Sequence, residues 1–594
     1  MILQHFIFPK EDICTDHELY IRKEQGAFDV EEQGIYMEGK GNYSFFTYFN
    51  SFSLGKWIHY TTVSDIAFTT EIQGSGIIRL YQAALHGQQV IHREVAQENY
   101  HSSDCQEISI PVPGEMQDGI LYVTVETAEK TYLNHARFET SQAPCREVSI
   151  AVGICTFKRE EYVRKTLQNL QSSFFDQPES ALHGHLHVYV SDNGNTLPYD
   201  AINGEYVRCY PNKNAGGASG FTRALLEALK DQDRQQYTHF LFMDDDISVE
   251  PEVLYRTFCL LSMVSEPYEQ AAIGGALLRK DLPRVQHTRG EIWATDMVRS
   301  VKGGYDLSQE KDLLKNEEVV PVDYNGWWYC CIPFSAELAD HLPLPFFIHV
   351  DDIEYGLRFP REIIYCNGIG VWHDAFDHRK SSSMEYYDMR NLLIMNALRR
   401  PKYTWKQARK RVWRHLIFQR LKYRYKDAEL TIRGVEDYCK GISFLKSQDP
   451  VALHQEIMGK GYGWTEQTER LDQIKPDWNE KEEVDRIMQY SREHRWQQLV
   501  TLNGWLLPAG RKIKAIPMGV SMGALYRVKH VLYYDPETGK GFVTVRKHRE
   551  LFRLLRDMCY VSHLLRRQYD RTAKEYRERE GEITSRPFWE KYLS

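Results

Sequence analysis

The chain has 594 residues, of which 42% are hydrophobic and 13% aromatic, so it is long enough for two or three domains and too apolar to be disordered. Its formal net charge of −8 is small for this length, which excludes a nucleic-acid binder that relies on a strong overall positive field. No stretch approaches the roughly 18 apolar residues that cross a bilayer, and the start lacks a basic region before an apolar signal core, so we expect a cytoplasmic protein. The 11 cysteines show no CxxC spacing and predict neither a disulfide framework nor a zinc site.

Residues 1–147 show short alternating runs of apolar and polar residues, separated by turn-forming residues. Ile77–Tyr81 and Leu121–Val125 are typical of these runs. A period of two predicts half-buried strands, and many such strands in succession predict a β-sandwich of the jelly-roll type. No catalytic constellation is present in this region, so we interpret it as a carbohydrate-binding or packing module.

Residues 148–395 begin with Val148–Cys155, a continuous apolar run that indicates a strand buried on both faces of a parallel sheet. Predicted helices and strands then alternate, at Glu160–Leu170, His185–Val190, Phe221–Leu229 and Thr238–Met243. This alternation predicts a Rossmann-like α/β domain with a mostly parallel sheet.

Residues 396–594 are mainly helical in pattern and rich in basic residues, with a hairpin predicted around Asp535–Gly539. The segments Lys402–Lys426 and Arg546–Arg579 carry most of this charge. One interpretation is an ordinary solvated helix face. The other is a basic surface that contacts anionic lipid headgroups or an anionic acceptor.

The acidic triplet Asp244-Asp245-Asp246 directly follows the third predicted strand. Three adjacent carboxylates repel one another, and the carboxyl edge of an open α/β sheet is where ligands bind. Asp244 and Asp246 point the same way in an extended chain and could share a divalent cation, while Asp245 faces a ribose or another partner. A solvated acidic loop is the alternative.

Three further segments follow predicted strands of this domain. The turn Thr156–Arg159 presents backbone N–H groups and a guanidinium to a diphosphate, or is simply a helix start. Asp192 is placed to accept hydrogen bonds from a base or a ribose, or else closes a turn. The glycine-rich stretch Asn214–Gly220 lacks the Gly-Lys-Ser/Thr of a Walker loop, which disfavours kinase and P-loop chemistry.

Later in the domain, Asp351, Asp352 and Glu354 lie at the start of a predicted helix. One of these carboxylates could be a general base, or all of them could be helix N-terminal acids. His373 could be a third ligand of the cation or a hydrogen-bonded structural residue. The pair Trp327-Trp328 suits either a sugar-stacking platform or the core.

In this order and spacing, Thr156–Arg159, Ser191–Asn193, Asn214–Gly217, Asp244–Asp246 and Asp351-Asp352 resemble the inverting family 2 glycosyltransferases of the GT-A fold. The β-sandwich in front, Trp327-Trp328, Asp351–Arg358, Trp372-His373 and the helical tail look like the bacterial polymerising galactofuranosyltransferases that build cell-wall galactan. The resemblance covers nearly the whole chain.

The resemblance implies a role for each matching residue. Asp244, Asp246 and His373 would hold Mn²⁺ or Mg²⁺, and Asp352 would be the general base with Asp351 beside it. The residues implied to bind the nucleotide are Thr156, Arg159, Asp192, Asn214, Gly217 and Asp245, and those implied to bind the acceptor are Trp327, Trp328 and Glu354.

The implied reaction is a single displacement with inversion, from UDP-galactofuranose to a lipid-linked galactan, by a homo-oligomer. The two basic segments separately predict peripheral contact with the inner face of the cell membrane. Ring size cannot be read from the residues, so UDP-galactopyranose, UDP-glucose or a dTDP-sugar stays open as the donor. A carbohydrate-binding or scaffold protein with a degenerate transferase domain is the alternative from another class.

Overall fold

The computed structural model describes residues 1–594 except 32–33, 295, 336–337, 339, 375–380, 475–494, 518–521 and 536–537. The chain divides into two compact units. The first comprises residues 1–213, 220–340 and 355–374, and the second comprises residues 214–219, 341–354 and 375–594. The predicted boundaries at 147 and 395 stay predictions, although the second falls inside the helix α9 (Ser382–Arg399).

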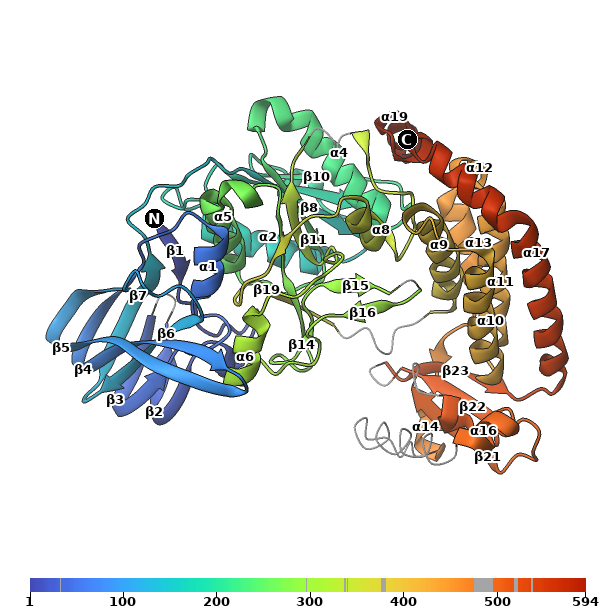
Figure 1. Ribbon diagram of the computed structural model, residues 1–594, viewed down its shortest axis with the longest axis horizontal. Coiled ribbons are helices and arrows are strands. Elements are labelled where there is room, and N and C mark those ends of the chain that lie inside the picture. Colours follow the sequence, from blue (N-terminus) through green and yellow to red (C-terminus); the bar gives the residue numbers. More distant parts are fainter. Residues whose placement is uncertain are drawn as a thin grey trace. The chain divides into compact units, whose positions relative to one another are not determined.

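The N-terminal part of the first unit is one antiparallel β-sheet (Figure 1). Its strands are β1 (Ile2–His5), β2 (Arg22–Val30), β3 (Gly34–Ser44), β4 (Ala67–His86), β5 (Gln89–Pro111), β6 (Ile120–Thr127) and β7 (Thr131–Glu139). Strands β3 and β4 each pair with β7 along one stretch and with β6 along another. The predicted β-rich region is therefore confirmed, but hydrogen bonds join its strands into one continuous sheet because these long strands pass from one partner to the next.

The rest of the first unit is built on a mostly parallel sheet in the order β10-β9-β8-β11-β17-β12-β18. Its strands are β8 (Ile150–Thr156), β9 (Leu186–Asp192), β10 (Val207–Pro211), β11 (His239–Asp244), β12 (Ala272–Gly274), β17 (Tyr329–Pro333) and β18 (Ile363–Ile364). Strands β8 to β11 run parallel, and β17 is antiparallel to its neighbours β11 and β12. The predicted α/β fold class is thus confirmed.

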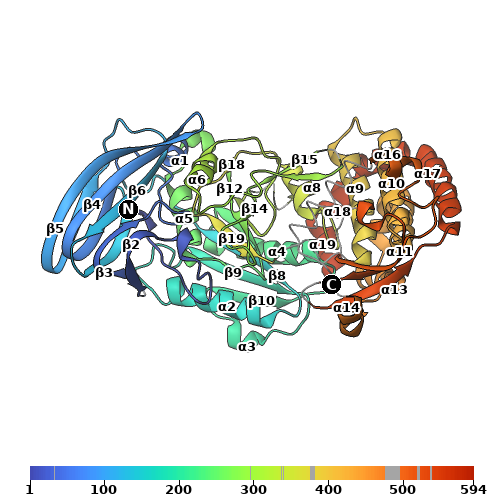
Figure 2. The ribbon, with the colours of Figure 1, turned by 90° about the horizontal axis from the view of Figure 1, so that it is seen from below.

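The helices α2 (Glu160–Leu170), α4 (Gly217–Gln235) and α5 (Pro251–Met263) follow β8, β10 and β11 in the chain (Figures 1 and 2). Chain order reverses between β8 and β11, since β9 and β10 lie on one side of β8 and β11 lies on the other. Such a switch point opens a crevice at the carboxyl ends of the strands, where open α/β sheets bind ligands.

The first unit also contains a second, smaller sheet. It has the order β14-β13-β19, from β13 (Ala276–Arg279), β14 (Gln286–Thr288) and β19 (Gly370–His373). Strands β13 and β19 run parallel, with Arg279 beside His373. A two-stranded ribbon of β15 (Glu291–Trp293) and β16 (Val298–Ser300) and the helix α6 (Glu310–Glu317) lie between these strands in sequence.

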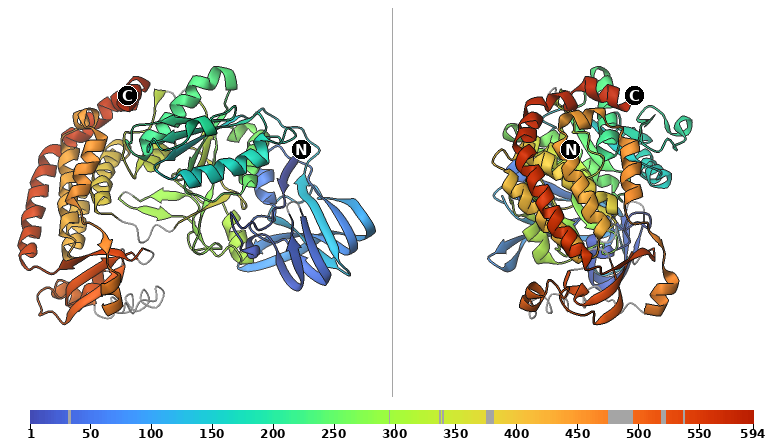
Figure 3. Two further views of the ribbon diagram at one scale, coloured as in Figure 1. Left: turned by 180° about the vertical axis from the view of Figure 1, so that it is seen from behind. Right: turned by 90° about the vertical axis from the view of Figure 1, so that its right-hand side faces the viewer.

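The second unit is mainly helical, as predicted. Its longer helices are α9, α10 (Trp405–Leu421), α11 (Tyr425–Cys439), α13 (Pro450–Lys460) and α17 (Arg549–Arg579). Helices α10 and α11 both pack against α17, and α11 packs against α9 (Figure 3). The predicted hairpin is present as β22 (Val528–Tyr534) and β23 (Lys540–Val545), with Pro536 and Glu537 of its turn outside the described residues.

Two more strands, β20 (Thr465–Glu466) and β21 (Arg511–Pro517), extend this hairpin into a small sheet that the sequence pattern did not predict. Within the described parts of the chain, no helix combines the length and the apolar character needed to cross a membrane.

Candidate active site

The acidic triplet lies at the carboxyl end of β11, at the switch point of the parallel sheet. Asp244 is the last residue of the strand and is half-buried, while Asp245 and Asp246 are 6% and 5% exposed. Charged side chains are rarely so buried unless they are paired or bind a metal. The partners of the triplet therefore define what this edge of the sheet can do.

His373 reaches the triplet from a strand that is distant in sequence. The segment after the triplet and β19 exchange two backbone hydrogen bonds, Ser248 N–H to Trp372 O at 2.8 Å and Trp372 N–H to Ser248 O at 2.9 Å. One ligand atom each from Asp244, Asp246 and His373 can be chosen so that all lie within 4.8 Å of one another. The three residues implied to bind metal are therefore brought together.

The chemistry of this donor set fits a divalent cation. Two carboxylates and one imidazole offer hard oxygen ligands and one borderline nitrogen, a combination that suits Mn²⁺ and is compatible with Mg²⁺. His373 Nδ1 lies 2.7 Å from the backbone oxygen of Asp374. In the neutral tautomer with the proton on Nδ1, the lone pair that can bind a metal is on Nε2. Nε2 is the ring nitrogen on the side of the triplet, 3.0 Å from Asp246 Oδ1.

Arg159 faces the triplet from the turn between β8 and α2, where it is the N-cap residue of the helix. Its Nη1 lies 2.9 Å from Asp245 Oδ1 and 2.7 Å from Asp246 Oδ2, and its side chain is 43% exposed. The guanidinium is thus held at the switch point with part of its surface open to solvent. That position suits contact with an anion bound beside the triplet.

The two buried aspartates have opposite pKa shifts. Burial raises the pKa of Asp245, and Arg159 only partly offsets this effect. Burial also acts on Asp246, but the hydrogen bond to His373 and the nearby Arg159 and Lys280 outweigh it and lower the pKa of Asp246 to about 2. Asp246 is therefore charged at neutral pH, as a cation ligand must be.

Lys280 is a site residue that sequence reasoning missed. Its Nζ donates to the backbone oxygen of Asp246 at 2.6 Å, and its backbone N–H donates to His373 O at 3.0 Å. Nζ also lies 3.8 Å from Asp374 Oδ1. Lys280 thus fixes both segments that carry the candidate ligands. The sequence signal was weak, because Lys280 follows a short strand that belongs to a separate sheet.

Asp192 was implied to bind the nucleotide, and the structure gives it another role. It is fully buried, and its carboxylate accepts hydrogen bonds from Gly194 N, Thr196 N, Leu197 N and Tyr199 Oη at 2.7–2.9 Å. The side chain therefore closes the turn after β9 and leaves no oxygen exposed for a ligand. Thr156, its neighbour in the sheet register, is likewise only 2% exposed.

The glycine-rich loop lies in the second unit, where it packs on the segment before α8 (Asp351–Arg358). Gly217 N–H donates to Phe347 O at 3.0 Å, so this N–H is already used. Gly216 has φ +92°, and a Cβ on it would lie 1.8 Å from Phe347 O. Glycine is required there by both conformation and space. Asn214, at the start of the loop, is half-buried.

Asp351 and Asp352 begin α8 and are both half-buried. The two residues before them, His349 and Val350, have φ values of 63° and 73°. A β-branched residue such as valine rarely adopts this conformation, and such strain is concentrated at functional sites. Asn391 holds the turn, since its Nδ2 donates to Ile348 O and His349 O at 3.0 Å. Burial raises the pKa of Asp351 to about 6.

Glu354 does not face an acceptor in this structure. It is fully buried, and its Oε1 accepts from Arg399 Nε at 2.7 Å. Because the side chain lies on the inner side of α8, toward α9, its ion pair joins the two helices. The acceptor role that the resemblance implies for Glu354 stays a prediction.

Trp327 and Trp328 are buried in this structure, and their acceptor role stays a prediction. They are 6% and 8% exposed. Trp327 stacks on Phe242 with ring centroids 4.5 Å apart at 7°, and Phe221 packs against it edge-on at 5.1 Å. Trp328 Nε1 donates to Gly275 O at 2.9 Å. The core alternative that the sequence left open is the one this conformation shows.

Two family models match the chain over successive ranges. Residues 3–141 match the model described as galactofuranosyltransferase 2 N-terminal, and residues 151–284 match the model described as glycosyl transferase family 2. The second range begins in β8 and contains Arg159 and the whole acidic triplet. The part of the α/β domain that carries the acidic triplet is therefore similar to the family 2 glycosyltransferases.

Curated relatives narrow the class further. Galactofuranosyltransferase GlfT2 from Mycolicibacterium smegmatis is 29% identical over 385 residues, which are 60% of this chain and 57% of that protein. Galactofuranosyltransferase GlfT2 from Mycobacterium tuberculosis is 29% identical over 390 residues, which are 60% of this chain and 58% of that protein. The chain thus matches less than two thirds of either relative, and its resemblance to the family 2 galactofuranosyltransferases is confirmed.

Among solved structures, a mannosyltransferase from Pyrobaculum calidifontis in complex with GDP-Man and Mn²⁺ is 12% identical. The match covers 43% of this chain and 65% of the mannosyltransferase chain. Its TM-score of 0.26 is too low to support any statement about the site.

Proposed function

We propose that this protein is a metal-dependent inverting glycosyltransferase that moves galactofuranose from UDP-galactofuranose to a galactan or other cell-surface glycan. The observation that carries the proposal is the convergence of Asp244, Asp246 and His373 at the switch point of a domain similar to the family 2 glycosyltransferases. The names of the curated relatives support galactofuranose as the sugar.

In the proposed donor site, Asp244, Asp246 and His373 hold Mn²⁺ or Mg²⁺. A divalent cation bound there would offset the negative charge that develops on the departing nucleoside diphosphate. Arg159 contacts the diphosphate through the exposed part of its guanidinium, and Asp245 keeps Arg159 oriented through their ion pair. The nucleotide contacts that the resemblance implies for Thr156, Asn214 and Gly217 stay predictions.

In the proposed acceptor site, Asp352 removes the proton from an acceptor hydroxyl as that oxygen attacks the anomeric carbon. A single displacement at that carbon inverts its configuration. Asp351, whose pKa is raised to about 6, hydrogen-bonds a neighbouring acceptor hydroxyl. The strained backbone at His349 and Val350 supports a positioning role for the turn that precedes both aspartates.

Paired variants test these roles. Asp352→Asn should retain binding of the donor with Mn²⁺ but lose transfer by a factor of about 10² to 10⁴. Asp244→Ala should lose the metal-dependent binding itself. Asp200→Asn, an exposed carboxylate on the short helix α3 (Tyr199–Ile202), is the control and should behave like the parent. Normal transfer by Asp352→Asn would remove the assignment of the base.

The donor sugar is tested by turnover with UDP-galactofuranose against UDP-galactopyranose, UDP-glucose and a dTDP-sugar, on a short galactofuranoside acceptor. We expect turnover with UDP-galactofuranose to exceed the others by at least about tenfold in kcat/KM. Preference for another donor would replace galactofuranose in the proposal. If neither turnover nor thermal stabilisation occurs with any of these donors and Mn²⁺, the chain is a binding or scaffold protein.

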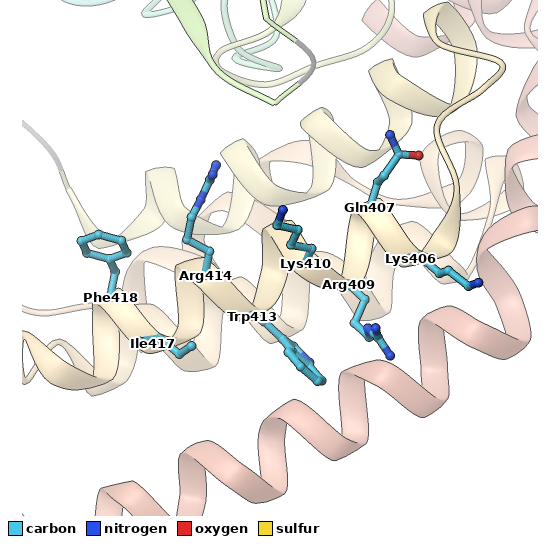
Figure 4. Close-up of a pocket in the computed structure, with 8 residues that line it drawn as sticks. All are labelled: Lys406, Gln407, Arg409, Lys410, Trp413, Arg414, Ile417 and Phe418. Atoms are coloured by element: carbon cyan, nitrogen blue, oxygen red, sulfur yellow. The ribbon is translucent and has the colours of Figure 1, made fainter. Parts of the chain in front are cut away.

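We also propose peripheral contact of the second unit with an anionic membrane. Lys402, Lys406, Lys410, Arg414 and Phe418 recur at every fourth position and are exposed. On α10, Lys410, Arg414 and Phe418 point away from α17, whereas Arg409 and Trp413 point toward it (Figure 4). Such a row places several cations and one aromatic ring on one side of a helix, which suits a lipid headgroup layer.

The structure removes part of the predicted basic surface. Arg420 is 1% exposed and forms ion pairs with Glu550 and Asp557 of α17, and Arg424 is 6% exposed and pairs with Asp427. These two arginines are buried in the helical unit, where each is neutralised by the carboxylates with which it pairs, and they are not available to a membrane.

Sedimentation with vesicles of anionic phospholipid at low salt tests the membrane proposal. The combined variant Lys406→Glu, Lys410→Glu, Arg414→Glu should lose binding, whereas Lys574→Glu on α17, an exposed lysine, should not. Equal binding of both variants would exclude the α10 row as the contact. The homo-oligomer implied by the resemblance is tested by analytical ultracentrifugation of the same samples.

A further inference from the structure

One face of the N-terminal sheet carries an unusual set of side chains. Residues paired across neighbouring strands point to the same face. Ser44, Thr124, Arg79 and Gln97 form one such row across β3, β6, β4 and β5. The next rows hold Tyr122, Tyr81 and Glu94 on one side, and Asn42 and Glu126 on the other. We call these residues the polar face.

The opposite side of the same strands is the core. Ile78, Leu80, Val123 and Val125 alternate with the polar-face residues and are fully buried. The alternation of polar and apolar residues therefore determines which face of the sheet is exposed to solvent. A shift of the strand pairing by one residue would bury the charged side chains of the polar face, so this register is strongly favoured.

Three aromatic rings stack from the core outward to the polar face. Phe46, Tyr122 and Tyr81 stack in that order, with centroids 4.6 Å apart at 22° and 5.3 Å apart at 16°. Tyr122 is only 6% exposed, whereas Tyr81 ends the stack and is half-buried. Tyr81 Oη donates to Glu94 Oε2 at 3.1 Å, which restrains the ring. The outer ring of the stack is thus a rigid apolar platform among polar groups.

The polar groups beside this platform already hold one another in place. Arg79 Nη1 lies 2.9 Å from Glu126 Oε2, and Arg79 Nε donates to Gln97 Oε1 at 3.3 Å. Asn42 Nδ2 donates to Glu24 Oε2 at 2.8 Å. Planar groups fixed in this way keep donor and acceptor positions that face solvent, and little conformational entropy is lost when a ligand binds to them.

A hollow of about 220 Å³ opens beside the stack, lined by Asn42, Ser44, Tyr122, Thr124 and their neighbours Glu24, His92 and Glu310. Glu310, from α6, closes one side of it, and His92 Nε2 lies 3.4 Å from its carboxylate. His92 Nδ1 lies 2.8 Å from Tyr122 Oη. The volume is below the roughly 300 Å³ at which pockets for drug-sized ligands begin, and suits one small ring.

Arg22 is a cation beside two residues that line the hollow, Ser44 and Glu310. It pairs with Ser44 in the β2–β3 register, and its Nη1 lies 3.7 Å from Glu310 Oε1. Its Nε and Nη2 are buried and have no hydrogen-bond partner among the described residues. The Arg22 guanidinium lies over the ring of Phe46, with Cζ 5.7 Å from the ring centroid, and so adds a cation at the buried end of the aromatic stack.

The charges decide the chemistry of the occupant. Arg79 and Arg22 are opposed by Glu94, Glu126 and Glu310 at 2.9–3.9 Å, and Glu24 adds a fourth carboxylate, so the surface holds more carboxylates than guanidinium groups and disfavours an anion. An anion would meet the carboxylates, and a cation would meet the arginines. A hydroxyl group both donates and accepts, and a sugar ring also offers an apolar face to tyrosine. An uncharged ring rich in hydroxyl groups matches every feature of the surface.

We propose that the polar face is a non-catalytic glycan-binding site. One sugar ring occupies the hollow beside Tyr122, and adjoining rings of the same chain lie along Tyr81, Arg79 and Asn42. The site takes a neutral glycan chain and takes no part in bond making or breaking. It goes beyond the proposed transferase activity, because it holds a glycan on residues that are separate from the triplet and from Asp352.

The test is calorimetric binding to the full chain. The probes are a linear β-galactofuranose hexasaccharide and a panel of neutral polysaccharides that includes arabinan, xylan and a β-glucan. We expect one of these probes to bind, and we expect Tyr81→Ala and Arg79→Ala each to raise its Kd by about tenfold or more. Tyr36→Ala is the matched control, since Tyr36 stacks on Tyr132 at another place in the same sheet.

Binding of every probe with equal Kd by the parent and by Tyr81→Ala would overturn the proposal, as would a lack of binding by the parent. The transfer assay keeps this result apart from the proposed function. Tyr81→Ala should retain the parent kcat and KM for a disaccharide acceptor, whereas Asp352→Asn should lose transfer and keep the calorimetric binding. Loss of transfer by Tyr81→Ala with unchanged glycan binding would also contradict a separate site.

Discussion

Lys280 allows a sharp test of how the candidate metal site is held. The change is Lys280→Met, which keeps most of the length of the side chain and its backbone N–H but removes Nζ. In the structure Nζ donates to Asp246 O at 2.6 Å, and the backbone N–H to His373 O at 3.0 Å is independent of the side chain. Only one of the two ties between the ligand segments is therefore cut.

The expected magnitude follows from that single contact. A hydrogen bond from a charged donor contributes about 1.5–3 kcal/mol, and removing an outer contact of a metal ligand lowers metal affinity by about 10- to 100-fold. We expect Lys280→Met to weaken Mn²⁺ binding within this range. The overall fold should persist, because burial and the neighbouring cations lower the pKa of Lys280 and show that its charge is not favoured by its surroundings as a whole.

The assay is titration of Mn²⁺ into the full chain, followed by the paramagnetic signal of the free ion, with the metal dependence of transfer as a second readout. Lys165→Met is the control, since Lys165 is an exposed lysine on α2 whose charge acts on Lys280 without a contact to Asp246. If both variants bind Mn²⁺ equally well, the Lys280 contact does not position the ligands.

Three further changes test the described packing. Asp192→Ala should lower the free energy of unfolding by about 2–4 kcal/mol in urea titration, because its carboxylate accepts four hydrogen bonds; a loss near zero would contradict the turn-closing role. Gly216→Ala should lower the free energy of unfolding by at least about 2 kcal/mol, because Gly216 has a φ of +92° and a Cβ there would collide with Phe347 O. Gly217→Ala is the control and should be tolerated, because its Cβ would meet only Asp351 Oδ2 at 3.5 Å. Burial raises the pKa of Glu250 from 4.5 to about 7, so the stability that the protonated acid contributes is lost as pH rises from 4.5 to 7. The free energy of unfolding of Glu250→Gln should therefore rise by up to about 3 kcal/mol relative to that of the parent between pH 4.5 and pH 8, in thermal or urea unfolding. If the difference between the two free energies stays constant across that range, the pKa of Glu250 is not raised.

The sequence by itself determined the order and type of the main elements of the α/β domain. The run Val148–Cys155 and the segment Thr238–Met243 are apolar on both faces, and both became buried strands, β8 and β11. Helix α2 begins and ends at the predicted residues, Glu160 and Leu170. These features follow from local hydrophobic pattern, which is read along the chain without knowledge of distant neighbours. The place of the acidic triplet at a strand end was predictable for the same reason.

The tertiary structure decided which of the candidate residues are accessible. Trp327 and Glu354 have the residue types of a binding site, yet each is buried against partners that the local sequence does not reveal. Glu354 pairs with Arg399, and Trp327 stacks on Phe242, across separations of 45 and 85 residues. The residue type of a carboxylate or an indole does not reveal whether it is buried, because burial depends on the residues that pack around it.

The same limit explains what the structure added. Lys280 contributes to the candidate metal site only because β13 pairs with β19, and the polar face exists only because β3, β6, β4 and β5 lie side by side in one register. Strand pairing between distant segments depends on the whole fold, whereas strand formation depends on the pattern within each segment. The sequence therefore determined the elements and the acidic triplet, and only the tertiary structure decided which side chains meet.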